Sequence, residues 1–452
     1  MSSSRVGPGW ALRVWLSAFW GRTGRDFNMI GITAMKLRYP CLRTLASAFV
    51  VVLATQLSDG AYALSLAEAM REAERDAPSL AAQAAQLEAA RNNAIPAGEL
   101  PDPKLLLGLQ NFPINGPDRG ELNAVPMTST KIGVMQQMLN SDKRVARIDT
   151  AKASVERASI EAQIERLNVR RETAMAWIST LALERKIALF KTLYAENQLL
   201  GKAVQARLAS GNGQTADAVA PKIQAAMLEE QEDQLHQELA QQRAALRRWV
   251  GLRANEKLTG SMPNWPVDAQ HYTHNLARHP ELAAYEPMAR EKEAQLRQAK
   301  AEKKSDWSWE VAYQNRDQDF GDMVSLQLSI DLPVFSGSRQ DPKIAARHSE
   351  LDKIEAEYQA QLRMHTQQLE DDLATYQRLN RAFKRNQATL IPLARDRVKL
   401  AMADYRAARN QLSAVISARQ GLIEAQLKQI DIEQQRALTS ARLYFTDIEA
   451  GL

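Results

Sequence analysis

The side chains that could bind a metal ion are few and scattered in this sequence. The six histidines are His236, His271, His274, His279, His348 and His365. Only His271 and His274 form a close pair, and a zinc site needs further ligands beside them, so we interpret both as surface residues. Met127, Met135 and Met138 flank or line an expected strand, where packing is their more common role. The sequence therefore predicts no metal site and no cofactor.

Catalytic motifs are also missing from the sequence. The segment SGNGQT, which starts at Ser210, resembles a phosphate-binding loop, but it lacks the Gly-Lys-Ser/Thr ending and falls between two expected helices. It is interpreted as a turn. No Gly-x-Ser-x-Gly segment or cysteine nucleophile is present in the part expected to fold. We therefore expect a protein that is not an enzyme.

A secretory signal is expected near the N-terminus. Met35 opens a segment with basic residues, an apolar stretch and Ala-Tyr-Ala at 61–63. The apolar stretch is too short to span a bilayer, which takes ~20 residues. We expect a signal peptide over 35–63, a mature chain that starts at Leu64, and an upstream extension over 1–34 that reflects a misassigned start.

The charge balance changes when this leader is removed. The full chain has a formal net charge of +5, but residues 1–63 hold seven of its 58 basic and two of its 53 acidic residues. The mature chain thus has 51 of each, and its composition does not indicate a nucleic-acid partner. Cys41, the only cysteine, precedes the apolar stretch, so we expect neither a lipid anchor nor a disulfide.

The mature sequence contains an internal duplication. The segment APSLAAQAAQLEAA at Ala77 recurs as HPELAAYEPMAREKEAQLRQA at His279, and LASGNGQTADAV at Leu208 recurs as YRAARNQLSAVI at Tyr405. Each copy predicts a helix, two strands, a very long helix, a turn and another long helix. We expect a first repeat over 64–250, a linker over 251–270 and a second repeat over 271–452.

The long helices are predicted from composition and apolar spacing. The first such stretch lacks proline, is rich in strong helix formers and places apolar residues at helical intervals. At about 70 residues it would extend roughly 100 Å. Pro392 is expected to kink or break a later helix. The expected helices are 141–208, 216–250, 343–408 and 412–448.

Four segments alternate apolar and polar residues, which is typical of strands with one face in an apolar environment. They are expected at 104–110, 128–138, 307–314 and 323–335. One face of the last two would present Trp307, Trp309, Val324, Leu326, Leu328 and Ile330, and the opposite face of the last would present Ser325, Gln327, Ser329 and Asp331.

This alternation predicts strands of a membrane β-barrel. In a bilayer every backbone polar group must be paired, so a sheet there must close on itself. Four strands are too few, because barrels have at least ~8. Several subunits must then share one barrel, with eight strands for a dimer or twelve for a trimer. A soluble sandwich is the alternative, but no second sheet is expected to cover this one.

The chain from about Leu64 to Leu452 resembles the TolC-like outer membrane factors. The resemblance rests on the duplicated element order, on HPELAA at His279 and on YRAARNQLSAVISARQ at Tyr405, which is similar to the pattern Y-x-x-G-x-x-S-x-x-D-V-L-x-A. It implies a mainly α fold in which three chains form a twelve-stranded β-barrel continuous with a periplasmic α-helical tunnel. The apolar strand face would then contact outer membrane lipid, and the polar face would line the lumen.

The resemblance also implies a function and partners. Such proteins are exit ducts of tripartite efflux systems, joined to a periplasmic adaptor and an inner-membrane resistance-nodulation-division pump. The turns at 208–219 and 405–416 would be the periplasmic tips, with Ala408 in place of the family glycine in the second tip and Ala414 and Ser417 where acids are common. The resemblance also implies that Asp217 matches a position where acidic residues near the tips form a constricting ring. A solvated first-turn carboxylate is the alternative interpretation of Asp217. The tip and gate candidates are Gly211, Asp217, Tyr405, Asn410 and Ser413.

The cargo is indicated by a separate resemblance. LPDPKLLLGLQNFPINGP followed by MTSTKIGVMQQM is similar to the heavy-metal branch of this family, which implies export of heavy-metal ions. A duct for drugs or for type I secretion is an alternative. A periplasmic coiled-coil adaptor or scaffold that forms no channel is a second alternative, although the lipoyl-like β-domain usual in adaptors is not found.

Overall fold

The structure is a computed structural model that describes residues 63–446 except 123, 212, 317–320 and 408. The chain divides into the units Met1–Ala61 and Tyr62–Leu452, and every described residue lies in the second. The expected upstream extension, Cys41 and the expected signal peptide up to residue 62 lie outside the described residues. Among the residues that are described, no helix is both long enough and apolar enough to cross a membrane.

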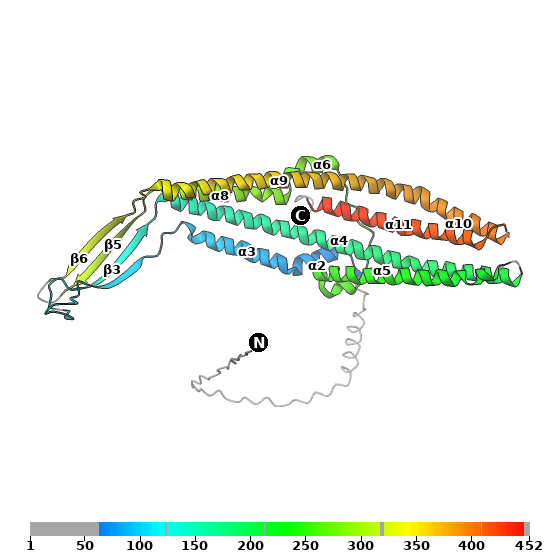
Figure 1. Ribbon diagram of the computed structural model, residues 1–452, viewed down its shortest axis with the longest axis horizontal. Helices are drawn as coiled ribbons and strands as arrows, with labels where there is room; N and C mark the ends of the chain where they lie inside the picture. Colours follow the sequence, from blue (N-terminus) through cyan, green and yellow to red (C-terminus); the bar gives the residue numbers. More distant parts are fainter. Residues whose placement is uncertain (1–62, 123, 212, 317–320, 408, 447–452) are drawn as a thin grey trace, which may run out of the picture. The chain divides into compact units, whose positions relative to one another are not determined.

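The second unit repeats one order of elements, as Figure 1 shows. The first repeat comprises α2 (Leu66–Asp76), α3 (Pro78–Ala94), η1 (Ile95–Gly98), β2 (Lys104–Gln110), β3 (Ser129–Met138), α4 (Ser141–Ala209), η2 (Thr215–Ala218) and α5 (Ala220–Val250). The second comprises α6 (Ala269–Asn275), η4 (Leu276–Arg278), α7 (Pro280–Ala283), α8 (Tyr285–Ala301), β5 (Trp307–Asn315), β6 (Met323–Ile330), α9 (Ser336–Arg385), η5 (Asn386–Leu390), α10 (Ile391–Arg406) and α11 (Leu412–Tyr444).

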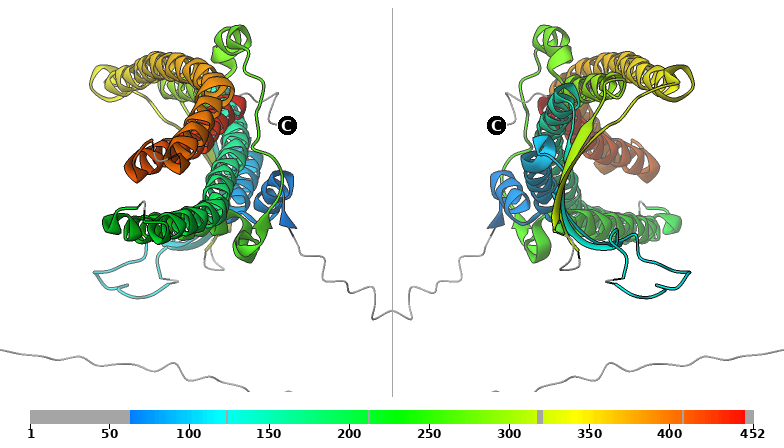
Figure 2. Two further views of the ribbon diagram at one scale, coloured as in Figure 1. Left: turned by 90° about the vertical axis from the view of Figure 1, so that its right-hand side faces the viewer. Right: turned by 90° about the vertical axis from the view of Figure 1, so that its left-hand side faces the viewer.

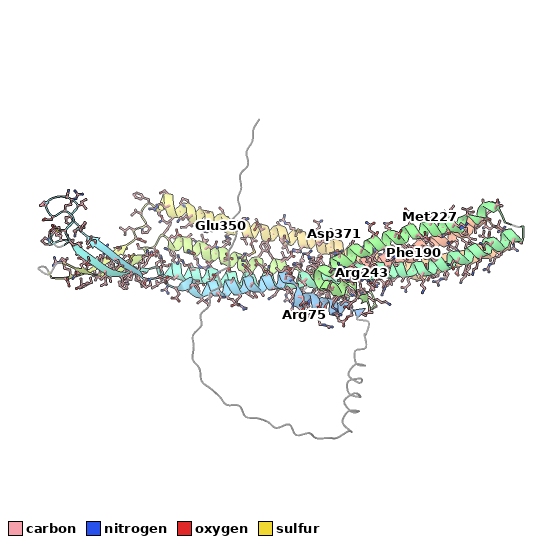
Figure 3. All side chains as sticks on the ribbon, turned by 90° about the horizontal axis from the view of Figure 1, so that it is seen from below. Arg75, Phe190, Met227, Arg243, Glu350 and Asp371 are labelled. Atoms are coloured by element: carbon pink, nitrogen blue, oxygen red, sulfur yellow. The ribbon has the colours of Figure 1, made fainter. Side chains whose placement is uncertain are left out.

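Helix α4 connects the strands to the first helical turn without interruption. Its 69 residues contain no proline. The side chain of Asn140 caps its start by accepting the backbone N–H of Lys143 at 2.9 Å. The helix ends where Gly211 takes a φ of 72°, a left-handed conformation that favours glycine. Its far half packs against α5, where Phe190, marked in Figure 3, contacts Leu193 and Leu228 in one buried cluster.

The corresponding helix of the second repeat differs from the prediction at its start and at its proline. Strand β6 ends at Ile330 instead of 335, and α9 begins at Ser336 instead of 343. Phe335, with a φ of 60°, turns the chain between them. Pro392 does not break the helix, because the π-helical turn η5 lies just before it and α10 continues directly. A wide π turn relieves the clash between a proline ring and the preceding turn.

The four long strands form one antiparallel sheet of order β2-β3-β5-β6. Two of its pairs are hairpins, and β3 with β5 joins the two repeats. In the register of β5 with β6, Trp309 lies opposite Leu328 and Val311 opposite Leu326. Their neighbours Glu310 and Gln327 pair on the other face. Because side chains alternate along a strand, the sheet has one apolar and one polar face.

The main core lies where the two repeats meet. It includes Leu64 and Trp177 from the first repeat and Ala441 from the second. The Trp177 indole N–H donates to the Leu64 carbonyl at 3.1 Å. The segment 251–270, expected as a linker, contributes Leu258 to this core, and its strand β4 (Lys257–Leu258) pairs in parallel with β1 (Ala63–Leu64). It therefore packs as part of the fold.

Candidate functional site

Nothing in the described part of the chain covers the apolar face of the sheet. Val324 is 72% exposed and Leu326 69% exposed, although both are large and apolar. The register extends this face over all four strands. An apolar surface of this kind marks contact with a membrane or another protein. Its exposed large members are Leu105, Leu107, Leu109, Ile132, Val134, Trp307, Val311, Tyr313, Val324, Leu326, Leu328 and Ile330.

The opposite face is polar and carries paired charges. Lys131 of β3 forms an ion pair with Glu310 of β5, and both side chains are largely shielded from solvent. Ser308 lies opposite Ser329, and Glu310 opposite Gln327. The predicted lumen-facing residues Ser325, Gln327 and Ser329 thus share one face of β6. Asp331 lies beyond the end of β6, and its backbone N–H donates to the Asp306 carbonyl at 2.9 Å.

The two outer strands leave the sheet open. Strands β2 and β6 each pair with one neighbour among the described residues, so a row of backbone N–H and C=O groups stays unpaired along each. Such edges are templates for pairing with another strand. The sheet is therefore incomplete in one chain, both at its edges and over its apolar face.

A buried carboxylate joins the sheet to the helices. Asp306, directly before β5, accepts hydrogen bonds from the Asn140 backbone N–H at 2.8 Å and from Lys143 Nζ at 2.5 Å. Burial raises the pKa of Asp306, but the hydrogen bonds from Lys143 and Asn140 outweigh burial and hold this pKa below its ordinary value. The carboxylate therefore stays charged and fixes the start of α4 against the start of β5.

The helical turns at the other end of α4 and α10 form a second candidate site. Asp217, Asn410 and Ser413 line one polar hollow of ≈ 550 Å³, together with Arg207 and Arg409. Figure 1 shows this end of the helices opposite the strands, and the end views of Figure 2 show α10 beside α11 there. The guanidinium groups of both arginines and the carboxylate of Asp217 thus border the same hollow.

Two of the predicted tip residues, Tyr405 and Gly211, shape the turns themselves. Tyr405 is buried, with the Arg207 guanidinium 4.3 Å from the centre of its ring. Arg207 also donates to the Tyr405 carbonyl at 3.1 Å, which ties the two turns together. Gly211 takes its positive φ in the first turn, and a Cβ there would meet no other atom within 4 Å. Gly211 and Tyr405 therefore shape the turns, whereas Asp217, Asn410 and Ser413 border the hollow.

The expectation that the histidines are scattered is wrong for one pair. His279 and His365 lie with ring centres 4.0 Å apart, and Glu281 lies beside them. Neither the spacing of these residues nor a motif could have revealed this, because α7 and α9 meet only in the folded chain. The close sequence pair His271 and His274 lies exposed on α6.

The comparisons with known proteins agree with this architecture. Residues 69–252 match the family of outer membrane efflux proteins. A search of curated proteins finds none that matches the chain. Similar solved structures include a membrane protein from Pseudomonas aeruginosa, with a TM-score of 0.74 and 19% identity over 84% of this chain and 89% of that one.

Two further solved structures are outer membrane proteins by description. The protein VceC from Vibrio cholerae has a TM-score of 0.69 and 19% identity, covering 85% of this chain and 95% of that one. The CmeC outer membrane channel of Campylobacter jejuni has a TM-score of 0.72 and 12% identity, with 86% of each chain covered. The chain has the fold of these solved structures, which confirms the predicted fold class.

Proposed function

We propose that this protein is the outer membrane exit duct of a tripartite efflux system and conducts its substrate passively. The observation that carries the proposal is the open four-stranded sheet with one uncovered apolar face. Such a sheet is complete only when its edges pair with other strands and its apolar face meets lipid. The match of residues 69–252 to outer membrane efflux proteins supports the same conclusion.

Three chains are proposed to close the barrel. Strand β6 of one chain would pair with β2 of the next, which gives twelve strands. In this arrangement Val324, Leu326, Leu328 and Ile330 contact lipid, as do Trp307 and Trp309. Ser325, Gln327 and Ser329 face the lumen, with Asp331 at its periplasmic rim.

The helical turns are proposed to dock a periplasmic adaptor, through which an inner-membrane resistance-nodulation-division pump drives transport. Asp217 borders the hollow between the turns. Three copies of this carboxylate around an axis would form a ring that favours cations, and the positive charges of Arg207 and Arg409 on the same hollow would reduce this preference. We further propose heavy-metal ions as cargo, on the resemblance of the segment from Leu100 to Met138 to the metal-exporting branch. Drugs and secreted proteins are the alternative cargoes.

Conductance and labelling together test the duct. The purified protein is expected to form cation-favouring channels in planar bilayers, and a scaffold would give none. In outer membranes, cysteine at Gln327 should react with a small water-soluble maleimide, whereas cysteine at Leu326 should not. Equal labelling of Leu326→Cys and Gln327→Cys would exclude lipid contact by this face.

The cargo is tested separately in a deletion strain. We expect increased sensitivity to heavy-metal ions, which a plasmid copy returns to the parental level, and unchanged sensitivity to hydrophobic drugs. The opposite pattern would reject metal cargo and leave the duct standing.

A further inference from the structure

A cluster of three metal-ligating side chains joins α7 to α9. His279 and Glu281 lie at the start of α7, and His365 projects from the middle of α9. One ligating atom from each side chain falls within 4.8 Å of the others. The side chain of His365 is only 13% exposed and that of Glu281 is 38% exposed. Two imidazoles and one carboxylate thus converge at a partly enclosed position.

The hydrogen bonds within the cluster conflict. His365 Nε2 lies 3.1 Å from Glu281 Oε2, an acceptor, and 3.0 Å from the amide nitrogen of Gln361, a donor. One ring nitrogen cannot donate to the carboxylate and accept from the amide at the same time. A cation between the two side chains would bind a lone pair of His365 Nε2 and a lone pair of the Glu281 carboxylate. The Gln361 amide would then donate to Glu281, whose Oε2 is 3.5 Å away.

We propose that His279, Glu281 and His365 bind a divalent transition-metal ion that links α7 to α9. Two nitrogens and one oxygen suit Zn²⁺, and also Cu²⁺ and Ni²⁺. Zinc bonds of ~2.0–2.1 Å place the atoms of tetrahedral ligands about 3.4 Å apart. The ligating atoms here lie within 4.8 Å of one another, so side-chain rotations that move them by about 1 Å complete the site. A cavity of ≈ 50 Å³, lined by both histidines, adjoins it and offers room for a water ligand.

The groups around the site allow this ion to bind. Burial, with the neighbouring His365 as a smaller cause, lowers the pKa of His279 to about 4. His279 Nδ1 accepts the Glu281 backbone N–H at 3.2 Å, and metal binding at either ring nitrogen exchanges this bond for the metal. Arg171 lies close enough to oppose a cation, but it is paired with Glu172 at 3.4 Å.

The one carboxylate among the described residues that line the adjoining cavity is already paired. Asp372 lines the same cavity, but it accepts from Arg442 at 2.6 Å. Glu281 is therefore the carboxylate that remains for the ion. The ion would hold α7, which has only four residues, against a long helix from a distant part of the sequence. This resident site is separate from the transported cargo and does not depend on the duct function.

Zinc titration of the full-length, detergent-solubilised protein tests the site. Isothermal calorimetry should show one Zn²⁺ per chain, and X-ray absorption should show nitrogen and oxygen neighbours with no sulfur. Loss of a ligand should weaken binding by more than the ~10–100-fold typical of changes around a metal site. The test variants are Glu281→Gln and His365→Gln, and the matched control is the double variant His271→Ala/His274→Ala.

The outcomes separate clearly. Loss of zinc binding in both test variants, with wild-type circular dichroism and an unaffected control, supports the site. Absence of stoichiometric binding to the wild type overturns it, as does unchanged binding in Glu281→Gln. Zinc binding lost only in the control variant would assign the ion to α6 and reject the proposal.

Discussion

The helical core and the sheet differ in what one chain can complete. The core around Trp177 buries its large side chains with residues from both repeats and from the segment between them. The sheet, by contrast, leaves Val324 and Leu326 exposed and two strand edges open. The core is therefore stable by contacts within the chain, whereas the sheet needs contacts from outside it. The two regions meet where Asp306 fixes the start of α4 against the start of β5.

This difference predicts which substitutions reduce the stability of the protein, and in which medium they do so. A change in the core should reduce stability in any solvent, because its contacts are all internal. A change on the apolar sheet face should matter only in lipid. The following predictions test this contrast from the largest expected effect to the smallest.

Trp177→Ala should destabilise the protein most. The side chain is 1% exposed, and removing a buried aromatic of this size typically costs ~3–5 kcal/mol. The indole hydrogen bond to Leu64 is lost as well. Thermal unfolding in detergent measures the change. Trp307→Ala is the matched control on the sheet and should shift the unfolding free energy by about 0.5 kcal/mol or less. Equal losses of unfolding free energy in the two variants would contradict the difference between core and sheet.

Leu326→Arg should be costly only in a bilayer. A basic side chain on the lipid face of a barrel costs ~2–4 kcal/mol near the midplane. Gln327→Arg, one residue further on the opposite face, should cost far less. Denaturant unfolding of the protein reconstituted in vesicles measures both. If the two arginines had equal effects in vesicles, the apolar face would not contact lipid.

Asp306→Asn should weaken the junction between sheet and helices by ~1–3 kcal/mol at neutral pH, because it leaves Lys143 without its charged partner. The folded-state pKa of Asp306 is lowered, so its stabilisation is complete above its ordinary pKa of 3.8 and is lost as the pH falls through the folded value. Unfolding free energies of wild type and variant should therefore converge at acid pH. A difference that stays constant down to pH 2 would contradict this assignment.

Gly211→Ala should have the smallest effect, about 1 kcal/mol, since alanine must take a left-handed conformation at a φ of 72°. No atom blocks its Cβ, so backbone conformation alone sets the cost. Gly201→Ala, inside α4 and in ordinary contact with Pro221, should instead stabilise by ~0.5–1 kcal/mol. Thermal unfolding in detergent compares the two, and changes of the same sign would argue against the turn geometry.

Local patterns in the sequence determined much of the sheet and the helices. The alternation from Val324 to Ile330 defines two faces because side chains of a strand point in opposite directions. The structure has the same grouping, with Val311 opposite Leu326. The absence of proline and the turn at Gly211 likewise set the extent of α4. In both cases neighbouring residues carry the signal.

Tertiary structure decided the features that depend on distant contacts. The π turn before Pro392 keeps α9 and α10 continuous, and no local pattern distinguishes it from a break. The pairing of β1 with β4 makes the expected linker part of the core. His279 and His365 become neighbours only because α7 packs against α9. Sequence periodicity reports which side of an element is apolar, whereas the partner of that side is set by the whole fold.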